Sequence, residues 1–221
     1  MKILCPNHKD TNPSFHIYAN GGYCFVCGYT DKTTVDLNNK VEKEDIQQTL
    51  EYINALPMDT IRGIQFPRDA YGYYILWPNR SFYKKRLFKQ DRIRYMAPKG
   101  IPVPLFSYTG DPGWPLAIVE GEINAISLKK AIPEGLNICS PGAITHFNKF
   151  MDKYLQYNRI YVIVDKDDAG IAYGASLKET LLQAGKNTSL IALEKDFNDI
   201  LMECGYDGIK KEIEKQKVGL Y

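Results

Sequence analysis

The stretch RIYVIVDKDDAG, residues 159–170, decides the fold. Its apolar side chains run with little interruption up to Asp165, which is typical of a strand buried on both faces of a parallel sheet. Similar apolar runs occupy residues 115–120, 136–140 and 188–193, and helix-favouring segments lie between them. Alternating strands and helices favour a parallel sheet with right-handed crossover connections. The sequence therefore predicts an α/β domain with a mainly parallel sheet in the C-terminal half.

Acidic residues stand where three of these predicted strands end. Glu120 closes the first run, Asp165 and Asp167 lie at the end of the third, and Asp196 comes after the last. Because the carboxyl ends of parallel strands form the ligand-binding edge of an open sheet, we expect these carboxylates to converge. Converging carboxylates repel one another unless a cation lies between them, and hard oxygen ligands suit Mg²⁺ or Mn²⁺. The pattern predicts a divalent-cation site.

Further acids beside these positions have a simpler interpretation. Asp168, Asp199 and Glu122 each fall at the start of a predicted helix. Negative side chains there cap the free backbone amides and interact favourably with the helix dipole. The sequence alone leaves both roles open for these three residues.

The N-terminal segment contains two short Cys/His pairs. Cys5-x-x-His8 is followed after a fifteen-residue gap by Cys24-x-x-Cys27. The four side chains supply a tetrahedral set at the spacing that zinc prefers, and a filled set leaves no open position for catalysis. A turn at residues 20–22 is expected to bring the pairs together, with Gly28 in a tight turn. A redox Cys-x-x-Cys would need a βαβ context, which this short hairpin lacks. We therefore expect one structural Zn²⁺.

The middle of the chain concentrates positive charge and aromatic rings. Between residues 80 and 99, eight Lys and Arg accompany a single acid, Asp91, and four aromatic residues are interleaved with them. Such a strand set offers cations for phosphates and rings for stacking on unpaired bases. A solvated edge sheet protected by lysines is the alternative. The candidates for contact with template or nucleotide are Arg80, Lys84, Lys85, Arg86, Arg94 and Lys99.

Composition sets the outer limits. The 221 residues carry a net charge of +2, so overall charge indicates no nucleic-acid partner and only its local distribution can. Neither a membrane-spanning apolar run nor a signal peptide is recognisable, and the five cysteines do not form a disulfide framework, which favours a cytoplasmic setting. We divide the chain into a zinc ribbon (1–36), a helical linker (37–58), a basic strand-rich part (59–112), an α/β domain (113–205) and a helical tail (206–221).

Three groups of motifs resemble those of one enzyme family. Glu120-Gly121, Asp165-x-Asp167 with Ala169-Gly170, and Lys195-Asp196-x-Asn198-Asp199 resemble a Toprim domain. The opening segment, with its four metal ligands and Asn12-Pro13-Ser14-Phe15, resembles the zinc-binding domain of the DnaG-type primases. The middle block, with FPRDAYGYYILWPNR and RYMAPKGIPVPLF, is similar to the N-terminal part of the primase polymerase core.

The resemblance implies template-directed synthesis of short RNA primers from ribonucleoside triphosphates on single-stranded DNA. It assigns catalytic and metal-binding roles to Glu120, Asp165 and Asp167, and a further metal ligand to Asp196. The basic middle is then the part that grips template and nucleotide. The zinc ribbon becomes the template-reading module, with His16 and Tyr18 as the residues to test.

Two departures from the family pattern qualify this interpretation. Asn124 stands where a further acid commonly follows the Glu-Gly motif, which would weaken a second metal. The sequence after the Toprim-like block is short, so we expect a small form of the phage, plasmid or mobile-element type without a helicase-binding domain. A separate replicative helicase is then a further candidate partner. The alternatives are a Toprim-type metal-dependent nuclease and a non-catalytic single-strand-binding replication protein.

Overall fold

The computed structural model describes residues 2–18, 21–32, 72–76, 82–87, 95–98 and 101–216. Within them the chain divides into two compact units, the first ending at residue 103 and the second beginning at residue 104. The expected helical linker at residues 37–58 lies outside the described residues. None of the helices in the described ranges combines the length and the hydropathy that a bilayer crossing requires.

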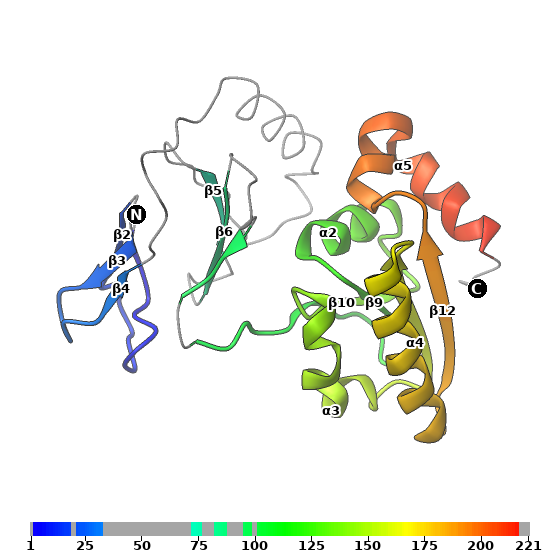
Figure 1. The fold of residues 1–221 in the computed structure, drawn as a ribbon, viewed down its shortest axis with the longest axis horizontal. Helices are drawn as coiled ribbons and strands as arrows, with labels where there is room; N and C mark the ends of the chain where they lie inside the picture. Colours follow the sequence, from blue (N-terminus) through cyan, green and yellow to red (C-terminus); the bar gives the residue numbers. More distant parts are fainter. Residues whose placement is uncertain are drawn as a thin grey trace. The chain divides into compact units, whose positions relative to one another are not determined.

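The second unit is built on a five-stranded sheet with strand order β12-β11-β9-β10-β8 (Figure 1). The strands are β8 (Phe106–Tyr108), β9 (Leu116–Val119), β10 (Asn137–Ser140), β11 (Arg159–Asp165) and β12 (Asn187–Leu193). β9, β10, β11 and β12 pair in parallel, as the apolar runs predict. β8 pairs antiparallel with β10 and lies before residue 113, where the α/β domain was expected to begin.

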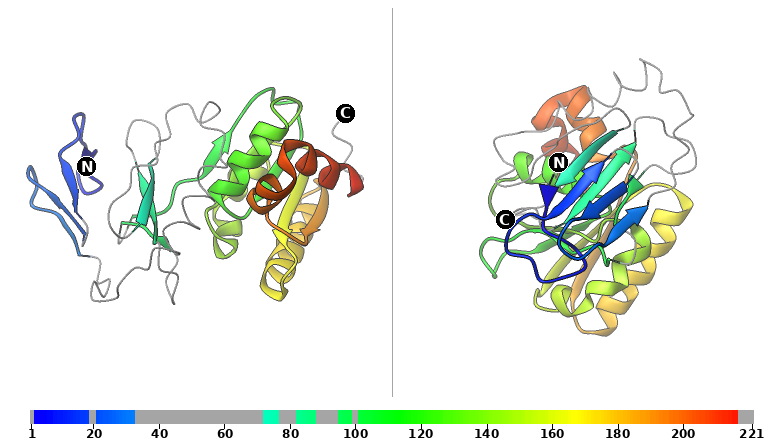
Figure 2. Two further views of the ribbon diagram at one scale, coloured as in Figure 1. Left: turned by 90° about the horizontal axis from the view of Figure 1, so that it is seen from above. Right: turned by 90° about the vertical axis from the view of Figure 1, so that its left-hand side faces the viewer.

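Helices cover both faces of this sheet, which explains why its central strands are apolar throughout. α2 (Glu122–Ala131) packs against α5 (Phe197–Lys215), and the two helices lie side by side in Figure 2. α4 (Asp168–Gln183) packs against β11, β12 and the 3₁₀ helix η2 (Ile144–Phe150), which continues into α3 (Met151–Tyr154). The core beneath α4 includes Ile118, Val162 and Leu177, none of which is exposed. The predicted α/β sheet is confirmed.

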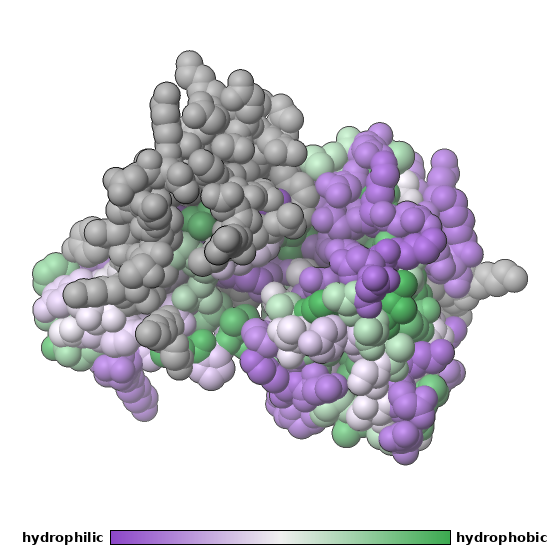
Figure 3. All heavy atoms as spheres, in the orientation of Figure 1, coloured by the Kyte–Doolittle hydropathy of each residue, from purple (hydrophilic) through white to green (hydrophobic). Residues whose placement is uncertain are grey.

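α5 is an amphipathic helix with a break. Leu201, Ile209 and Ile213 are buried, whereas the surface over α5 is mostly hydrophilic in Figure 3. The helix changes direction at Gly205, where φ is +67°, a left-handed conformation that side-chain-bearing residues rarely adopt. The helical tail predicted from residue 206 is the part of α5 beyond this break.

The described part of the first unit contains two antiparallel sheets. The N-terminal sheet has the order β1 (Lys2–Ile3), β2 (Phe15–Tyr18), β3 (Gly21–Cys24) and β4 (Thr30–Lys32). Gly21 and Gly22, which the sequence placed in a turn, lie in β3 opposite Tyr18 and Ile17. Gly22 is required there because a Cβ atom would collide with the ring of Phe15.

The other sheet consists of β5 (Gly72–Leu76), β6 (Tyr83–Leu87) and β7 (Tyr95–Met96). One core joins it to the N-terminal sheet. Phe15 and Cys24 from the N-terminal sheet are buried together with Tyr74, Leu76 and Tyr83 from β5 and β6. The N-terminal sheet therefore uses one face for packing and leaves the other face outward.

Candidate metal centres and nucleic-acid interface

Cys5, His8, Cys24 and Cys27 form a compact ligand set. One ligand atom from each lies within 4.8 Å of all the others, and the Cys5 and Cys27 sulfurs are 3.5 Å apart. The backbone shapes the second pair: Gly28 N–H donates to the Cys24 carbonyl at 2.9 Å, and Gly28 has a φ of +71°. The predicted tight turn at Gly28 is confirmed. Three cysteine sulfurs and one imidazole are a usual ligand set for tetrahedral Zn²⁺, and these four residues fit such an ion.

His8 is oriented toward such an ion. Its Nδ1 atom is buried and has no hydrogen-bond partner among the described residues. Its Nε2 atom lies 4.0 Å from Asp10 Oδ1, in the position of a carboxylate that orients a metal-binding histidine. An unpartnered buried nitrogen is costly, and a metal bond would satisfy it.

Asp10 organises this first loop, although its role was not predicted from the sequence. Its side chain accepts hydrogen bonds from the Ser14 hydroxyl at 2.6 Å and from the backbone N–H groups of Cys5, Asn12 and Ser14. These bonds, led by that of the Ser14 hydroxyl, lower the pKa of Asp10 to about 2. An Asp followed two residues later by Asn-Pro-Ser is a local signal for such a loop, because a short carboxylate readily bonds nearby amides.

The outward face of the N-terminal sheet carries a row of polar and aromatic side chains. Strand pairing aligns Lys2 with His16, His16 with Tyr23 and Tyr23 with Thr30. Phe25 completes the row: its ring centroid lies 4.6 Å from that of His16 and 4.8 Å from that of Tyr23, both edge to face. Phe25 is 64% exposed. We call these five residues the ribbon platform.

The ribbon platform contains one of the two predicted recognition residues, His16. Burial and the positive charge of Lys2 lower the pKa of His16, which favours the neutral ring. The side chain of the other predicted residue, Tyr18, lies outside the described part of the structure. Tyr23 and Phe25 were missed, since only strand register shows that they share a face with His16.

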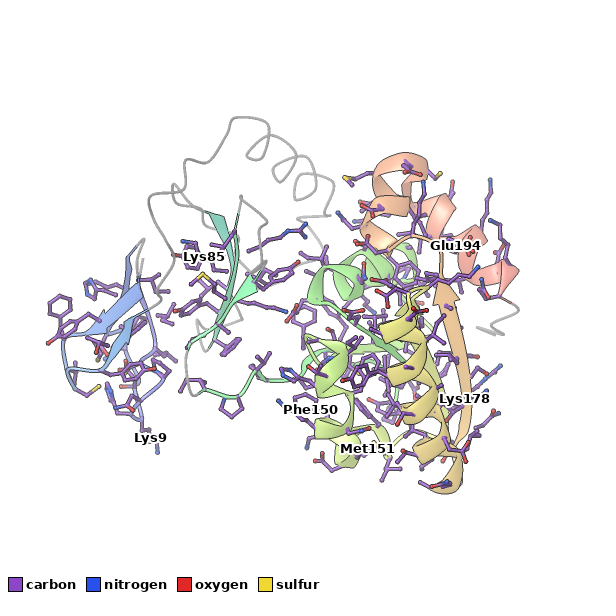
Figure 4. All side chains as sticks on the ribbon, viewed as in Figure 1. Lys9, Lys85, Phe150, Met151, Lys178 and Glu194 are labelled. Atoms are coloured by element: carbon purple, nitrogen blue, oxygen red, sulfur yellow. The ribbon has the colours of Figure 1, made fainter. Side chains whose placement is uncertain are left out.

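The basic residues of β6 divide between two faces of their sheet. Lys84 lies 4.6 Å from the centre of the Tyr95 ring, and Arg86 donates to the Tyr95 hydroxyl at 3.0 Å. Lys85 lies over Tyr74 on the other face, which packs on the N-terminal sheet (Figure 4). All three side chains are buried. Arg80, Arg94 and Lys99 lie outside the described residues.

The acids of the second unit come from three neighbouring strands. Glu120 follows β9, Asp165 ends β11, and Asp196 follows β12, with β11 between the other two strands. The parallel register sets Ile163 opposite Val119 and Asp165 opposite Leu193, so the three strands end together. We call Glu120, Asp165, Asp167 and Asp196 the acid ring.

Repulsion within this region is visible at Asp165. Burial raises the pKa of Asp165, and the charges of Asp196, Asp167 and Asp199 raise it further. Ionising this carboxyl therefore costs more in the folded chain than in the unfolded chain. A divalent cation among the four acids would remove that cost, and carboxylate oxygens are suitable ligands for Mg²⁺ or Mn²⁺.

Two members of the acid ring also cap helices. Asp167 Oδ1 accepts the N–H of Gly170 at 2.6 Å at the start of α4, and Asp196 Oδ1 accepts the N–H of Asp199 at 2.8 Å at the start of α5. Capping uses one carboxylate oxygen of two, so it fixes each side chain while remaining compatible with a cation. Asp168 and Asp199 lie in the first turns of α4 and α5, and Glu122 lies buried in the first turn of α2.

Lysines flank the acid ring and pair with other acids. Lys166 Nζ contacts Glu194, which lies directly after β12 (Figure 4). Lys195 Nζ lies 2.6 Å from a carboxylate oxygen of Glu203 in α5. These exposed pairs hold the two cations on acids outside the ring.

Comparison with known protein families finds a match within the second unit. Residues 117–201 match the family model described as Toprim-like, and this span contains the whole acid ring. The segment is therefore a Toprim-like domain. No curated protein sequence matches the chain.

The whole chain is similar to solved primase structures. The primase fragment of the bacteriophage T7 primase-helicase protein is 17% identical, with a TM-score of 0.54 over 97% of this chain and 98% of that one. A DnaG primase catalytic domain bound to single-stranded DNA is 13% identical, with a TM-score of 0.47 over 79% of this chain. A DNA primase domain from Pseudomonas aeruginosa is 15% identical, with a TM-score of 0.45, also over 79%. This chain spans 59% and 60% of the last two.

The match over nearly the full length of both chains shows the fold of the phage primase fragment, and this fold includes a Toprim-like domain. The resemblance expected from the sequence is thereby confirmed at the level of the fold.

Removing the metal from the Cys/His set should loosen more than the N-terminal sheet. Because that sheet shares a core with Tyr74, Leu76 and Tyr83, we expect a strong chelator to increase hydrogen exchange in both β2–β3 and β5–β6. Residues 104–216, which form the other unit, should keep their protection. Hydrogen exchange followed by mass spectrometry measures this. Increased exchange confined to residues 2–32 would show that the shared core does not couple the two sheets.

Replacing Asp165 by Asn should separate repulsion from cation binding. The raised pKa means that the cost of ionising Asp165 develops as the pH rises from the ordinary range of an Asp carboxyl and is fully present above the raised pKa. Without divalent cations, Asp165→Asn should therefore melt at a higher temperature than the wild type. With Mn²⁺ at a hundred-fold excess over its Kd, the wild type should gain about 2.7 kcal/mol, and the variant should lose most of that gain.

Thermal unfolding in chelator and across a Mn²⁺ titration tests this expectation. Asp152→Asn is the matched control, because Asp152 is an exposed acid whose neighbour Lys153 lies 3.4 Å away. An equal Mn²⁺-induced shift in Asp165→Asn and wild type would place the cation elsewhere.

Proposed function

We propose that this protein is a DNA primase that synthesises short RNA primers from ribonucleoside triphosphates on single-stranded DNA. One observation supports the proposal: in a chain whose fold is similar to that of a phage primase fragment, Glu120, Asp165 and Asp196 lie at or just after the ends of three neighbouring strands. The reaction is nucleotidyl transfer, in which a primer hydroxyl attacks the α-phosphate and pyrophosphate leaves.

The acid ring would hold the catalytic Mg²⁺ or Mn²⁺. A bound cation supplies charge neutralisation for the triphosphate and lowers the pKa of an attacking hydroxyl. Glu120 and Asp165 approach from adjacent strands, so the sheet fixes their separation. The helix caps made by Asp167 and Asp196 orient their carboxylates before any ligand arrives. This preorganisation supports a role in positioning the reacting phosphate.

The N-terminal unit would bind the template. The ribbon platform combines one cation with three rings, and exposed rings stack on unpaired bases whatever their sequence. A structural Zn²⁺ in the Cys/His set would hold β3 and the Cys24–Cys27 turn, which carry Tyr23 and Phe25. We retain His16 and Tyr18 as candidates for choosing the start site.

The basic strand β6 would contribute to the grip on template or nucleotide. Lys84 and Arg86 share a face with Tyr95, and a joint phosphate-and-base contact on that face would require these buried side chains to become accessible when the template binds. Lys85 lies on the opposite face, over Tyr74, and is better placed to connect this sheet with the N-terminal sheet. Arg80, Arg94 and Lys99 remain candidates from the sequence. A separate replicative helicase is a further candidate partner.

The proposal is tested by ribonucleotide incorporation on a set of short single-stranded templates. With Mg²⁺ or Mn²⁺ we expect template-dependent oligoribonucleotides. Glu120→Gln should lower the rate at least about a hundred-fold, which corresponds to about 2.7 kcal/mol in the barrier. Glu134→Gln is the control, because Glu134 is exposed in the loop before β10, at the opposite edge of the sheet.

The other outcomes distinguish the alternatives. Metal-dependent cleavage of the template without incorporation would replace the primase by a Toprim-type nuclease. Template binding with neither cleavage nor incorporation by metal-loaded protein would favour a non-catalytic single-strand-binding role.

Phe25→Ala should weaken binding to single-stranded DNA. Loss of one base–ring stack costs about 1–3 kcal/mol, so the Kd should rise about five-fold or more, measured by fluorescence anisotropy. Val26→Ala is the matched control: Val26 is the next residue, 70% exposed. Equal effects of the two substitutions would show that the ribbon platform does not bind the template.

A further inference from the structure

Asn124 connects two parts of the acid ring that are far apart in sequence. It lies in the first turn of α2, four residues after Glu120, and its Oδ1 accepts the backbone N–H of Phe197 at 3.1 Å. Phe197 is the first residue of α5 and directly follows Asp196. The first N–H groups of a helix have no partner within that helix. Asn124 therefore caps α5 from a neighbouring helix.

A second bond joins the same two helices deeper in the core. Ser127, one turn after Asn124, donates from Oγ to Asn198 Oδ1 at 3.2 Å, and neither residue is exposed. Residues three apart lie on one face of a helix. This face of α2 therefore contacts two successive residues of α5, and α2 and α5 lie together in Figure 1.

The two bonds act at different places relative to the acid ring. The bond from Asn124 reaches the backbone at the peptide that links Asp196 to Phe197. The bond from Ser127 reaches only the side chain of Asn198. Asp196 also caps α5 through Asp199, so a shift in the first amides of the helix would move its carboxylate. Of these two bonds, the one from Asn124 acts on the peptide next to an acid of the ring, and the one from Ser127 does not.

The uncharged nature of Asn124 matters as much as its oxygen. Three acids already act on Asp165, and a carboxylate at residue 124 would add another negative charge beside the peptide that links Asp196, one of those three acids, to Phe197. An amide oxygen accepts the same N–H without adding charge. The side chain supplies the geometry that a carboxylate would supply, at lower electrostatic cost in the absence of a cation.

We infer that Asn124 is a positioning residue of the acid ring, which holds the start of α5, and with it Asp196, at the strand ends that carry Glu120 and Asp165. This inference rests on the proposed function only for the identity of the site as catalytic. Its consequence for cation binding stands by itself. Asn124 then sets how well Asp196 can share a divalent cation with the acids of β9 and β11.

The test compares Asn124→Ala with Ser127→Ala in the full chain. Each variant removes one bond between α2 and α5, and both should melt at a lower temperature than the wild type in chelator. The Mn²⁺ concentration that gives half of the thermal shift should rise about ten-fold in Asn124→Ala and stay within two-fold of the wild type in Ser127→Ala. Equal Mn²⁺ midpoints in the two variants would reduce Asn124 to a structural residue and overturn the inference.

Asn124→Asp provides an independent variant that keeps the acceptor oxygen. The added charge should lower its melting temperature in chelator and enlarge its Mn²⁺-induced shift. A melting temperature and a Mn²⁺ shift equal to those of the wild type would contradict the placement of residue 124 beside the acid ring. This outcome remains decisive even if Asn124→Ala does not fold.

The Mn²⁺-induced shift in melting temperature tests the inference separately from the proposed function, because its measurement needs neither template nor nucleotide. A wild-type protein that shows no Mn²⁺-induced shift overturns the inference. A protein that shows the expected shifts but makes no primer overturns only the primase proposal.

Discussion

The site of the second unit depends on the parallel pairing of β11 with both of its neighbours. With β9 on one side and β12 on the other, the backbone groups of β11 are bonded within the sheet, and helices bury both of its faces. Polar side chains are then confined to the strand ends, and parallel strands end at the same edge. Asp165 lies at the centre of that edge and shows the electrostatic cost most directly, in its raised pKa. The arrangement that stabilises the sheet thus concentrates charge where a cation can bind.

The features predicted from the sequence are those encoded within a few residues. A buried parallel strand is a continuous apolar run, and an acid at its end is visible in the same ten residues. The spacing of Cys5, His8, Cys24 and Cys27 likewise follows from the two short turns that present the ligands. These signals gave the α/β sheet, its order of strands and helices along the chain, and the two groups of candidate ligands.

Features that depend on contacts between distant segments were not predicted. Nothing near residues 106–108 indicates that β8 adds to the sheet of the second unit, because its partner β10 lies some thirty residues later. The run Lys84–Arg86 looked like one basic patch, but alternation along a strand sends Lys85 to the opposite face. The hydrogen bond that Asn124 accepts from Phe197 was not foreseen, because the two residues lie 73 positions apart in the sequence. In each case pairing in space, rather than composition, decides the role.

The N-terminal sheet shows how one strand can serve a metal site and a binding face at once. Along β3 the side chain of Tyr23 points outward to the ribbon platform, and that of Cys24 points into the core shared with β5 and β6. Phe25 follows immediately, in the turn closed by the bond from Gly28 to Cys24. A metal held by Cys24 and Cys27 therefore fixes the register of β3 and the turn beyond it together. Metal binding, core packing and the direction of the exposed rings consequently depend on one another in this segment.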